Sequence, residues 1–279
     1  MRELTASIDC PSTSARNRHE LVIEIGNIPV CVRTANSAFL QMLENRYVGF
    51  VGSTRHADYE FEVELAPPGE VGADDDLCVL RRAGRWSFER GDFRAEWDPS
   101  SNQGSIRQSA NPYSIDSVLR IVHTLVLARE GSFLVHAASA VRNGRAFLFA
   151  GASGAGKTTI SSLAPKDAVL LTDEISYVRR HEGGYFAFGT PFAGELAKSG
   201  ENTSAPIAAL YLLAKGPENR IEPVGPVDSS RALLESILFF AQDPELVQSV
   251  FQAACEFVCR VPIYRLTFVP DARVWEMIA

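Results

Sequence analysis

Residues 145–159 read RAFLFAGASGAGKTT, and this segment carries the strongest structural signal in the second half of the chain. Its first six residues are almost all apolar, which predicts a central β-strand buried on both faces. Gly151 to Thr158 match the pattern Gly-x-x-x-x-Gly-Lys-Thr, and Thr158 to Leu163 are compatible with a helix. A strand, a glycine-rich loop and a helix in this order predict a loop that wraps around phosphate groups.

The loop has the residue types that a bound triphosphate requires. Glycines let main-chain N–H groups converge on phosphate oxygens, and the start of the following helix adds partial positive charge. We expect Lys157 to reach the β and γ phosphates and the Thr158 hydroxyl to ligate Mg²⁺. A glycine-rich turn that only tightens a strand–helix corner is the alternative. With ATP and Mg²⁺ as cofactors, the predicted nucleotide-binding residues are Gly151, Ala152, Ser153, Gly154, Ala155, Gly156, Lys157, Thr158 and Thr159.

Two acidic residues follow the next apolar run. Ala168 to Thr172 predict another buried strand, and Asp173 and Glu174 come directly after it. Adjacent carboxylates repel each other unless a cation lies between them, so the pair indicates a metal site or a proton-transfer task. One acid could hold the metal while the other accepts the proton of an attacking hydroxyl. A solvated strand end is the alternative.

Two further residues are candidates for the same site. His136 lies on the predicted strand before the loop strand. It could contact the γ phosphate or tune the base, or it could be an ordinary core histidine. Glu195 ends the segment Thr190–Glu195, in which proline and glycine fix a bend, and that segment could equally be a connecting loop.

The composition is that of a globular protein of one or two domains. The chain has 279 residues, of which 46% are apolar and 22% charged. A formal charge of -7 without a long basic run argues against a nucleic-acid partner. No apolar stretch reaches the length of a membrane span, and the polar residues 1–18 lack a secretory signal, so we expect a cytoplasmic protein without a membrane partner. Five scattered cysteines are typical of reduced thiols.

The strand and helix signals divide the chain into two parts. Short alternating strands from about residue 20 to 108 predict a small, mainly β N-terminal domain at 1–110, which could recognise an acceptor. The second domain, 111–279, is predicted to be α/β with the P-loop in its core. Its expected helices are one that begins at an N-cap Ser114, one at Ser229–Phe240 and one at Pro244–Val258. The oligomeric state is open, and a homo-oligomer is one option.

Together these residues resemble the HPr kinase/phosphorylase-like family, which shares a P-loop core with ATP-dependent phosphoenolpyruvate carboxykinase. The wider layout is similar to HPr-kinase-related proteins found beside peptide natural-product genes, some of which are lasso-peptide kinases that phosphorylate a serine of a precursor peptide. The resemblance covers about Tyr113 to Phe268. Its most specific parts are His136-Ala137-Ala138, Asn143-Gly144, the loop Phe149 to Thr158, and Leu171-Thr172-Asp173-Glu174.

The resemblance implies a role for each matched residue. Asp173 would be the base on the acceptor hydroxyl, and Glu174 would lie at a metal-associated position. His136 would match the histidine that precedes the family's P-loop, and Glu195 a later acidic position. The glycine-rich signature that follows the acidic pair in authentic HPr kinases is not found in this chain, and Thr159 stands where those enzymes usually have glutamate, so HPr is not the expected substrate.

The sequence therefore predicts an ATP- and Mg²⁺-dependent serine kinase that acts on a peptide or protein. The alternative is a nucleotide-binding switch or NTPase without a phosphoacceptor. An ABC-type ATPase is disfavoured because the chain shows no serine-glycine-glycine signature segment in the right place. A carboxykinase-like lyase is disfavoured because the chain is short and no arginine set for substrate carboxylates can be identified.

Overall fold

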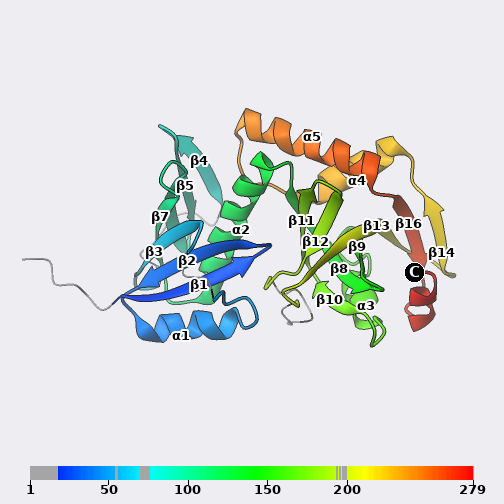
Figure 1. Cartoon of the computed structure of the whole chain (residues 1–279), viewed down its shortest axis with the longest axis horizontal. Helices are drawn as coiled ribbons and strands as arrows, with labels where there is room; N and C mark the ends of the chain where they lie inside the picture. The colour runs from blue at the N-terminus through cyan, green and yellow to red at the C-terminus, as the bar shows by residue number, and fades with distance from the viewer. Residues whose placement is uncertain are drawn as a thin grey trace, which may run out of the picture.

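The computed structural model describes residues 18–53, 56–69, 76–192, 194, 196 and 200–278. The described chain is a mixed α/β structure with two sheets, and the helix α2 (Pro112–Arg129) lies between them (Figure 1). All strands of the first sheet precede α2 in the sequence, and all strands of the second follow it.

The first sheet has the strand order β1-β2-β3-β7-β6-β5-β4 in the described chain. Its inner strands β2, β3 and β7 run parallel, and the helix α1 (Ser37–Arg46) makes the crossover from β2 to β3. The alternation at residues 59–65 is as expected, because Phe61 and Val63 are buried while Glu62 and Glu64 are exposed or nearly so. The strands are β1 (His19–Ile25), β2 (Ile28–Thr34), β3 (Tyr59–Leu65), β4 (Cys78–Arg82), β5 (Arg85–Arg90), β6 (Phe93–Asp98) and β7 (Gln103–Gln108).

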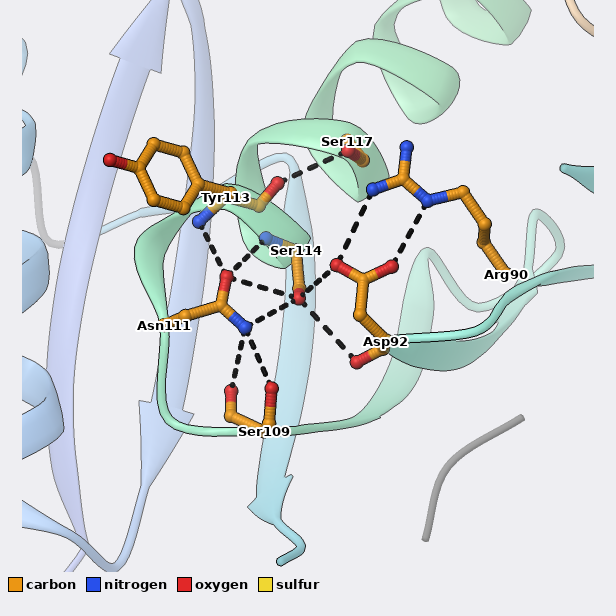
Figure 2. Close-up of polar contacts among 7 residues, drawn as sticks. All are labelled: Arg90, Asp92, Ser109, Asn111, Tyr113, Ser114 and Ser117. Atoms are coloured by element: carbon orange, nitrogen blue, oxygen red, sulfur yellow. Dashed lines mark hydrogen bonds and ion pairs between the residues drawn. The ribbon is translucent and has the colours of Figure 1, made fainter. Parts of the chain in front are cut away.

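The N-terminus of α2 corrects one sequence prediction. Asn111, not Ser114, is the N-cap: its Oδ1 accepts hydrogen bonds from the backbone N–H groups of Tyr113 (2.9 Å) and Ser114 (3.0 Å). Pro112 then takes the first helical position, where its fixed φ is already helical. Ser114 instead donates its hydroxyl to Asp92 Oδ2 (2.7 Å), which ties the helix to the turn between β5 and β6 (Figure 2).

Helix α2 is buried on almost every side. Its residues from Ser114 to Ala128 are buried with few exceptions, which is the pattern of a helix inside a core rather than on a surface. One apolar cluster joins α2 to strands of the first sheet and to Leu134, Ile175 and Tyr177 of the second. The two sheets therefore share a core through α2.

The second sheet has nine strands in the described chain, and β9 is central as predicted. It pairs with β8 on one side and with β13 on the other. The predicted hairpin at Asn143-Gly144 is confirmed, with positive φ at both residues (51° and 74°). The strands are β8 (Phe133–Arg142), β9 (Arg145–Ala150), β10 (Val169–Thr172), β11 (Ile175–His181), β12 (Gly184–Phe188), β13 (Ser204–Lys215), β14 (Arg220–Pro223), β15 (Ile237–Leu238) and β16 (Ile263–Phe268).

Two expectations for this half are wrong in detail. The helix expected at Ser229–Phe240 is α4 (Pro226–Ser236), because Ile237 and Leu238 leave the helix as β15 and pair with β8. Strand β10 is buried only at Leu171 and Thr172, because it stands at the end of the strand order and pairs with β8 alone among the described strands. The remaining helices are α3 (Lys157–Ser162), α5 (Pro244–Arg260) and the 3₁₀ helix η1 (Ala272–Glu276).

None of the helices in the described ranges combines the length and apolar character needed to cross a bilayer.

The buried histidine of α2 predicts how stability depends on pH. His123 Nδ1 lies 2.9 Å from the Tyr177 hydroxyl, and burial, with a smaller effect of the Arg179 charge, lowers the His123 pKa from 6.5 to about 3. The unfolded chain therefore binds more protons than the folded one between these values. The free energy of unfolding should fall as the pH drops through this window, with His123 contributing up to about 1.4 kcal/mol per pH unit.

Urea unfolding at a series of pH values checks this expectation. His123→Gln should flatten the dependence between pH 6.5 and 3, whereas His181→Gln, at the exposed end of β11, should leave it unchanged. Equal slopes for the wild type and His123→Gln would contradict the assignment.

Candidate functional site

The glycine-rich loop starts beside the middle of β8. Ala137 of β8 pairs with Ala150 of β9, and Gly151 begins the loop directly after that pair. The next strand over from β9 is β13, which runs parallel to it. The loop therefore leaves the sheet at the carboxyl end of a central strand, where open α/β sheets bind ligands.

The acidic pair lies on the opposite side of β8. Strand β10 pairs with β8 residues 139–141, and β11 pairs with residues 133–136. Asp173 and Glu174 form the connection between these two pairings, so they lie level with residues 137–138. Strand β8 lies between the loop and the acids. Because neighbouring strands are about 4.8 Å apart, two strand spacings place the loop and the acids roughly 10 Å from each other. A triphosphate that extends from the loop would point its terminal group across this distance.

The loop requires glycine at two of its positions. Gly154 and Gly156 have φ of 77° and 113°, a left-handed region that other residues rarely adopt. Gly156 also precedes α3 directly, and a Cβ placed on it would lie 2.8 Å from the ring of Phe268. Lys157 folds back across the loop and donates a hydrogen bond from Nζ to the carbonyl oxygen of Gly151 (3.0 Å). Thr158 and Thr159 follow in the first turn of α3.

Residues of the 3₁₀ helix η1, near the end of the chain, support this loop, and no sequence pattern predicted their role. Trp275 of η1 donates its indole N–H to the carbonyl oxygen of Ile160 in α3 (3.0 Å) and packs edge-on against Phe149. Arg142 donates to the Trp275 carbonyl oxygen (2.6 Å) and so fixes η1 to the end of β8. A tryptophan in a buried setting needs an acceptor for its N–H, which is the one signal that could have indicated this contact.

Asp173 fastens the segment that follows Thr190. Its side chain is only 3% exposed and accepts hydrogen bonds from the backbone N–H groups of Gly194 (2.8 Å) and Leu196 (2.9 Å), one on each oxygen. Gly194 approaches so closely that a Cβ there would lie 3.0 Å from Asp173 Oδ2. Glu195 lies outside the described residues, so its predicted part in the metal site stays a prediction.

His136 completes the group around β8. It pairs in register with Ile175, the first residue after the acids. Burial lowers the His136 pKa below 6.5, and the positive charge of Lys157 lowers it further. The register brings the two positions to the same place, because His136 precedes Ala137, the partner of Ala150, and Lys157 bonds to the carbonyl oxygen of the residue that follows Ala150. At neutral pH the imidazole is therefore uncharged, and one nitrogen can donate a hydrogen bond while the other accepts one.

A contact that the sequence did not predict joins α2 to this region. The guanidinium carbon of Arg120 lies 4.8 Å from the ring centroid of Phe192, a cation–π contact. Phe192 is fully buried and stands two residues before Gly194, which Asp173 binds. The segment that Asp173 fastens is thus also held from the α2 side.

The residues present fit a magnesium site of the kind that nucleotides use. Among the described residues, no group of three or more histidine, cysteine, aspartate or glutamate side chains gathers as a metal cage. Mg²⁺ bound with a nucleotide needs no such cage, because phosphate oxygens and water supply most of its ligands. The hydroxyl of Thr158 and the carboxylate of Glu174, on the two sides of β8, are therefore suitable protein ligands for a nucleotide-bound Mg²⁺.

The fold and site define a mixed α/β protein in which a glycine-rich, lysine-containing loop and an acidic pair flank one strand. Residues 105–279 match the model of the family described as SynChlorMet cassette protein ScmC. The match covers well over half of the 279 residues, so the chain belongs to this family. That description names a cassette protein and states no activity. No curated protein matches the chain.

Among solved structures, one similar chain is the Hpr(Ser) kinase/phosphatase from Coxiella burnetii. It is 13% identical, and the similarity covers 43% of this chain and 87% of that one, with a TM-score of 0.23. A TM-score this low does not establish a common fold. The HPr-kinase-like core therefore stays a prediction from the sequence motifs.

The hydrogen bonds of Asp173 predict a local effect of its removal. Asp173→Ala should speed amide exchange at Gly194 and Leu196 by about ten-fold or more, because both N–H groups lose a charged acceptor. The amide of Gly189, which donates to the Thr203 carbonyl oxygen (2.9 Å), is the internal control and should keep its rate. Unchanged exchange at both Gly194 and Leu196 would mean that Asp173 does not hold the segment.

Proposed function

We propose that this protein is a kinase that transfers the γ phosphate of ATP to a hydroxyl group, with a serine of a peptide or protein as the acceptor. The observation that carries the proposal is the convergence on β8 of three groups from distant parts of the chain. Lys157 bonds to the loop directly after the strand pair that follows His136, and Asp173 lies one strand away on the other side. A donor site, a neutral imidazole and a carboxylate in one place suit phosphoryl transfer.

The loop side would bind the donor. The glycines and the first turn of α3 would direct their backbone N–H groups and the positive end of the helix toward phosphate oxygens. Lys157 would exchange its bond to the Gly151 carbonyl oxygen for the β and γ phosphates. His136 would contact the γ phosphate from the strand beneath it.

The acid side would activate the acceptor. The serine oxygen forms a bond to the γ phosphorus, and the bond from that phosphorus to the β–γ bridging oxygen breaks, so its electron pair leaves with ADP. The proton of the serine hydroxyl passes to Asp173, whose two oxygens each keep a lone pair beyond the loop amides they bind. Asp173 would thus position the segment and accept the proton.

Magnesium, when bound with the nucleotide, would neutralise charge that builds up between the β and γ phosphates. Thr158, Glu174 and Glu195 are the residues we assign to hold it, with phosphate oxygens and water as the other ligands.

We assign acceptor recognition to the first sheet. A hollow of about 1380 Å³ lies over it, lined by strand residues of both charges that include Glu62, Glu64, Arg94 and Arg107. A surface with this mixed charge suits a polar peptide better than a nucleic acid, which needs a basic stripe.

A nucleotide-binding switch without an acceptor is the competing function, and one experiment separates the two. The purified protein is incubated with ATP, Mg²⁺ and peptides encoded beside its gene, and the peptides are examined by mass spectrometry for added phosphate. Phosphate on a peptide serine supports the kinase. Nucleotide binding with every peptide unmodified would contradict it and leave the switch.

Substitutions within the site predict different failures. Lys157→Ala should abolish transfer and weaken binding of the magnesium–ATP complex while the fold is retained, because it removes the charge on the β and γ phosphates. Asp173→Asn should lower transfer by about 100-fold or more with nucleotide binding kept, because the proton loses its acceptor. Calorimetry and single-turnover assays measure the two effects. Full activity of Lys157→Ala would disprove the proposal.

A further inference from the structure

Helix α2, which joins the two sheets, carries Arg120, an arginine that forms no ion pair within the described residues. Arg120 lies one turn after Asp116 on α2, and the carboxylate of Asp116 is bonded to two residues at the end of α1. Oδ1 accepts from the Tyr47 hydroxyl (2.5 Å), and Oδ2 accepts from Arg46 (2.5 Å). The carboxylate of Asp116 thus binds the C-terminal end of α1 through Arg46, and Arg120 is a second arginine one turn along α2 from it.

The guanidinium of Arg120 is partly desolvated. Its Nε is fully buried and, within the described ranges, no atom accepts a hydrogen bond from it. The contact with the Phe192 ring covers one face of the group and offers no acceptor. A buried N–H of a charged group without an acceptor is costly, and a bound anion is one way of supplying the acceptor.

The direction of α2 can be read from two contacts with β11. His123 contacts the Tyr177 hydroxyl, and Glu130, just beyond the end of α2, pairs with Arg179 (2.8 Å). The residue that comes later in the helix direction contacts the residue that comes later in the strand. Helix α2 and strand β11 therefore run in the same direction, and residues of both lie in the shared core.

This direction places Arg120 beside the site. It lies three residues before His123, about 4.5 Å back along the helix. Two residues before Tyr177 on β11 is Ile175, roughly 6.6 Å back along the strand. Arg120 is thus level with Ile175, and Ile175 is the register partner of His136. The guanidinium stands at the α2 side of the face on which His136 and Lys157 meet.

We propose that Arg120 binds the terminal phosphate of a nucleotide held by the glycine-rich loop. This inference rests on the proposed function. Lys157 would approach the γ phosphate from the loop, and Arg120 from α2 on the side where Phe192 and Asp173 lie. The planar guanidinium can donate two parallel hydrogen bonds to phosphate oxygens, a geometry that an ammonium group cannot offer. Arg120 would then contact the γ phosphate, which is transferred, and not the α and β phosphates, which remain in ADP.

The test compares two nucleotides on one set of variants. Calorimetry measures the binding of magnesium–ADP and of magnesium with a non-hydrolysable ATP analogue that carries an imido link between its β and γ phosphates. The variants are Arg120→Met, which keeps an unbranched side chain but removes the guanidinium, and Arg120→Lys, which keeps the charge. Arg129→Met is the matched control, since Arg129 also lies on α2 and also stacks on an aromatic ring, that of Trp97.

The inference expects a selective loss. Arg120→Met should weaken the analogue about ten-fold or more and leave ADP unchanged, Arg120→Lys should lie between it and the wild type, and Arg129→Met should change neither. Equal affinity of wild type and Arg120→Met for the analogue would overturn the inference while the proposed function stands. If Arg120→Met, and not the control variant, bound neither ADP nor the analogue, the inference would also be overturned, because that outcome would assign Arg120 a structural role. A wild type that binds neither nucleotide would instead overturn the proposed function itself.

Discussion

The arrangement of the site depends on the hydrogen-bond register of one strand. Strand β8 pairs with β9 along its second half, with β11 along its first, and with β10 at its far end. These pairings bring together a loop at residue 151 and acids at residues 173 and 174. A slip of β8 by one residue would turn His136 to the opposite face of the sheet. Such a slip would break the pairing of β8 with β9, β10, β11 and β15 together. This cost explains why the register is well defined.

The second element on which the structure depends is α2, which contributes to both cores. Its N-terminus is held by Asn111 and by the Ser114–Asp92 bond, its middle by Asp116 and His123, and its end by the turn that leads into β8. Ser114, Asp116 and His123, which α2 buries, each reach a partner on another element. Thr124 donates to the Ile121 carbonyl oxygen of the same helix, and Arg120 Nε finds no acceptor among the described residues. The apolar residues around them face both sheets, so neither sheet would keep a complete core without the helix.

Local sequence patterns were enough to predict the central elements. They failed where contacts with residues distant in sequence determine where an element begins or ends. The apolar run at 145–150, the Asn143-Gly144 turn and the glycine-rich loop depend on neighbouring residues, so their positions follow from the sequence. The start of α2 was misplaced because Asn111 and Ser114 are both acceptable caps, and only the contact of Ser114 with Asp92 decides between them. The end of α4 was misplaced because β15 forms only against β8. The supports from Trp275 and Phe192 come from segments far from the loop in sequence, and no short pattern announces them.

The burial of α2 also limits how the molecule can move. Separating the two sheets would expose the apolar faces that meet on this helix, at about 25 cal/mol for each Å² that water reaches. The tie between the Gly26 carbonyl oxygen and Arg179 across the same junction would break as well. The shared core therefore opposes a hinge motion between the two sheets of the kind on which many enzymes rely for closure. Entry and departure of small molecules must then be governed by short surface segments that can rearrange while both sheets stay still.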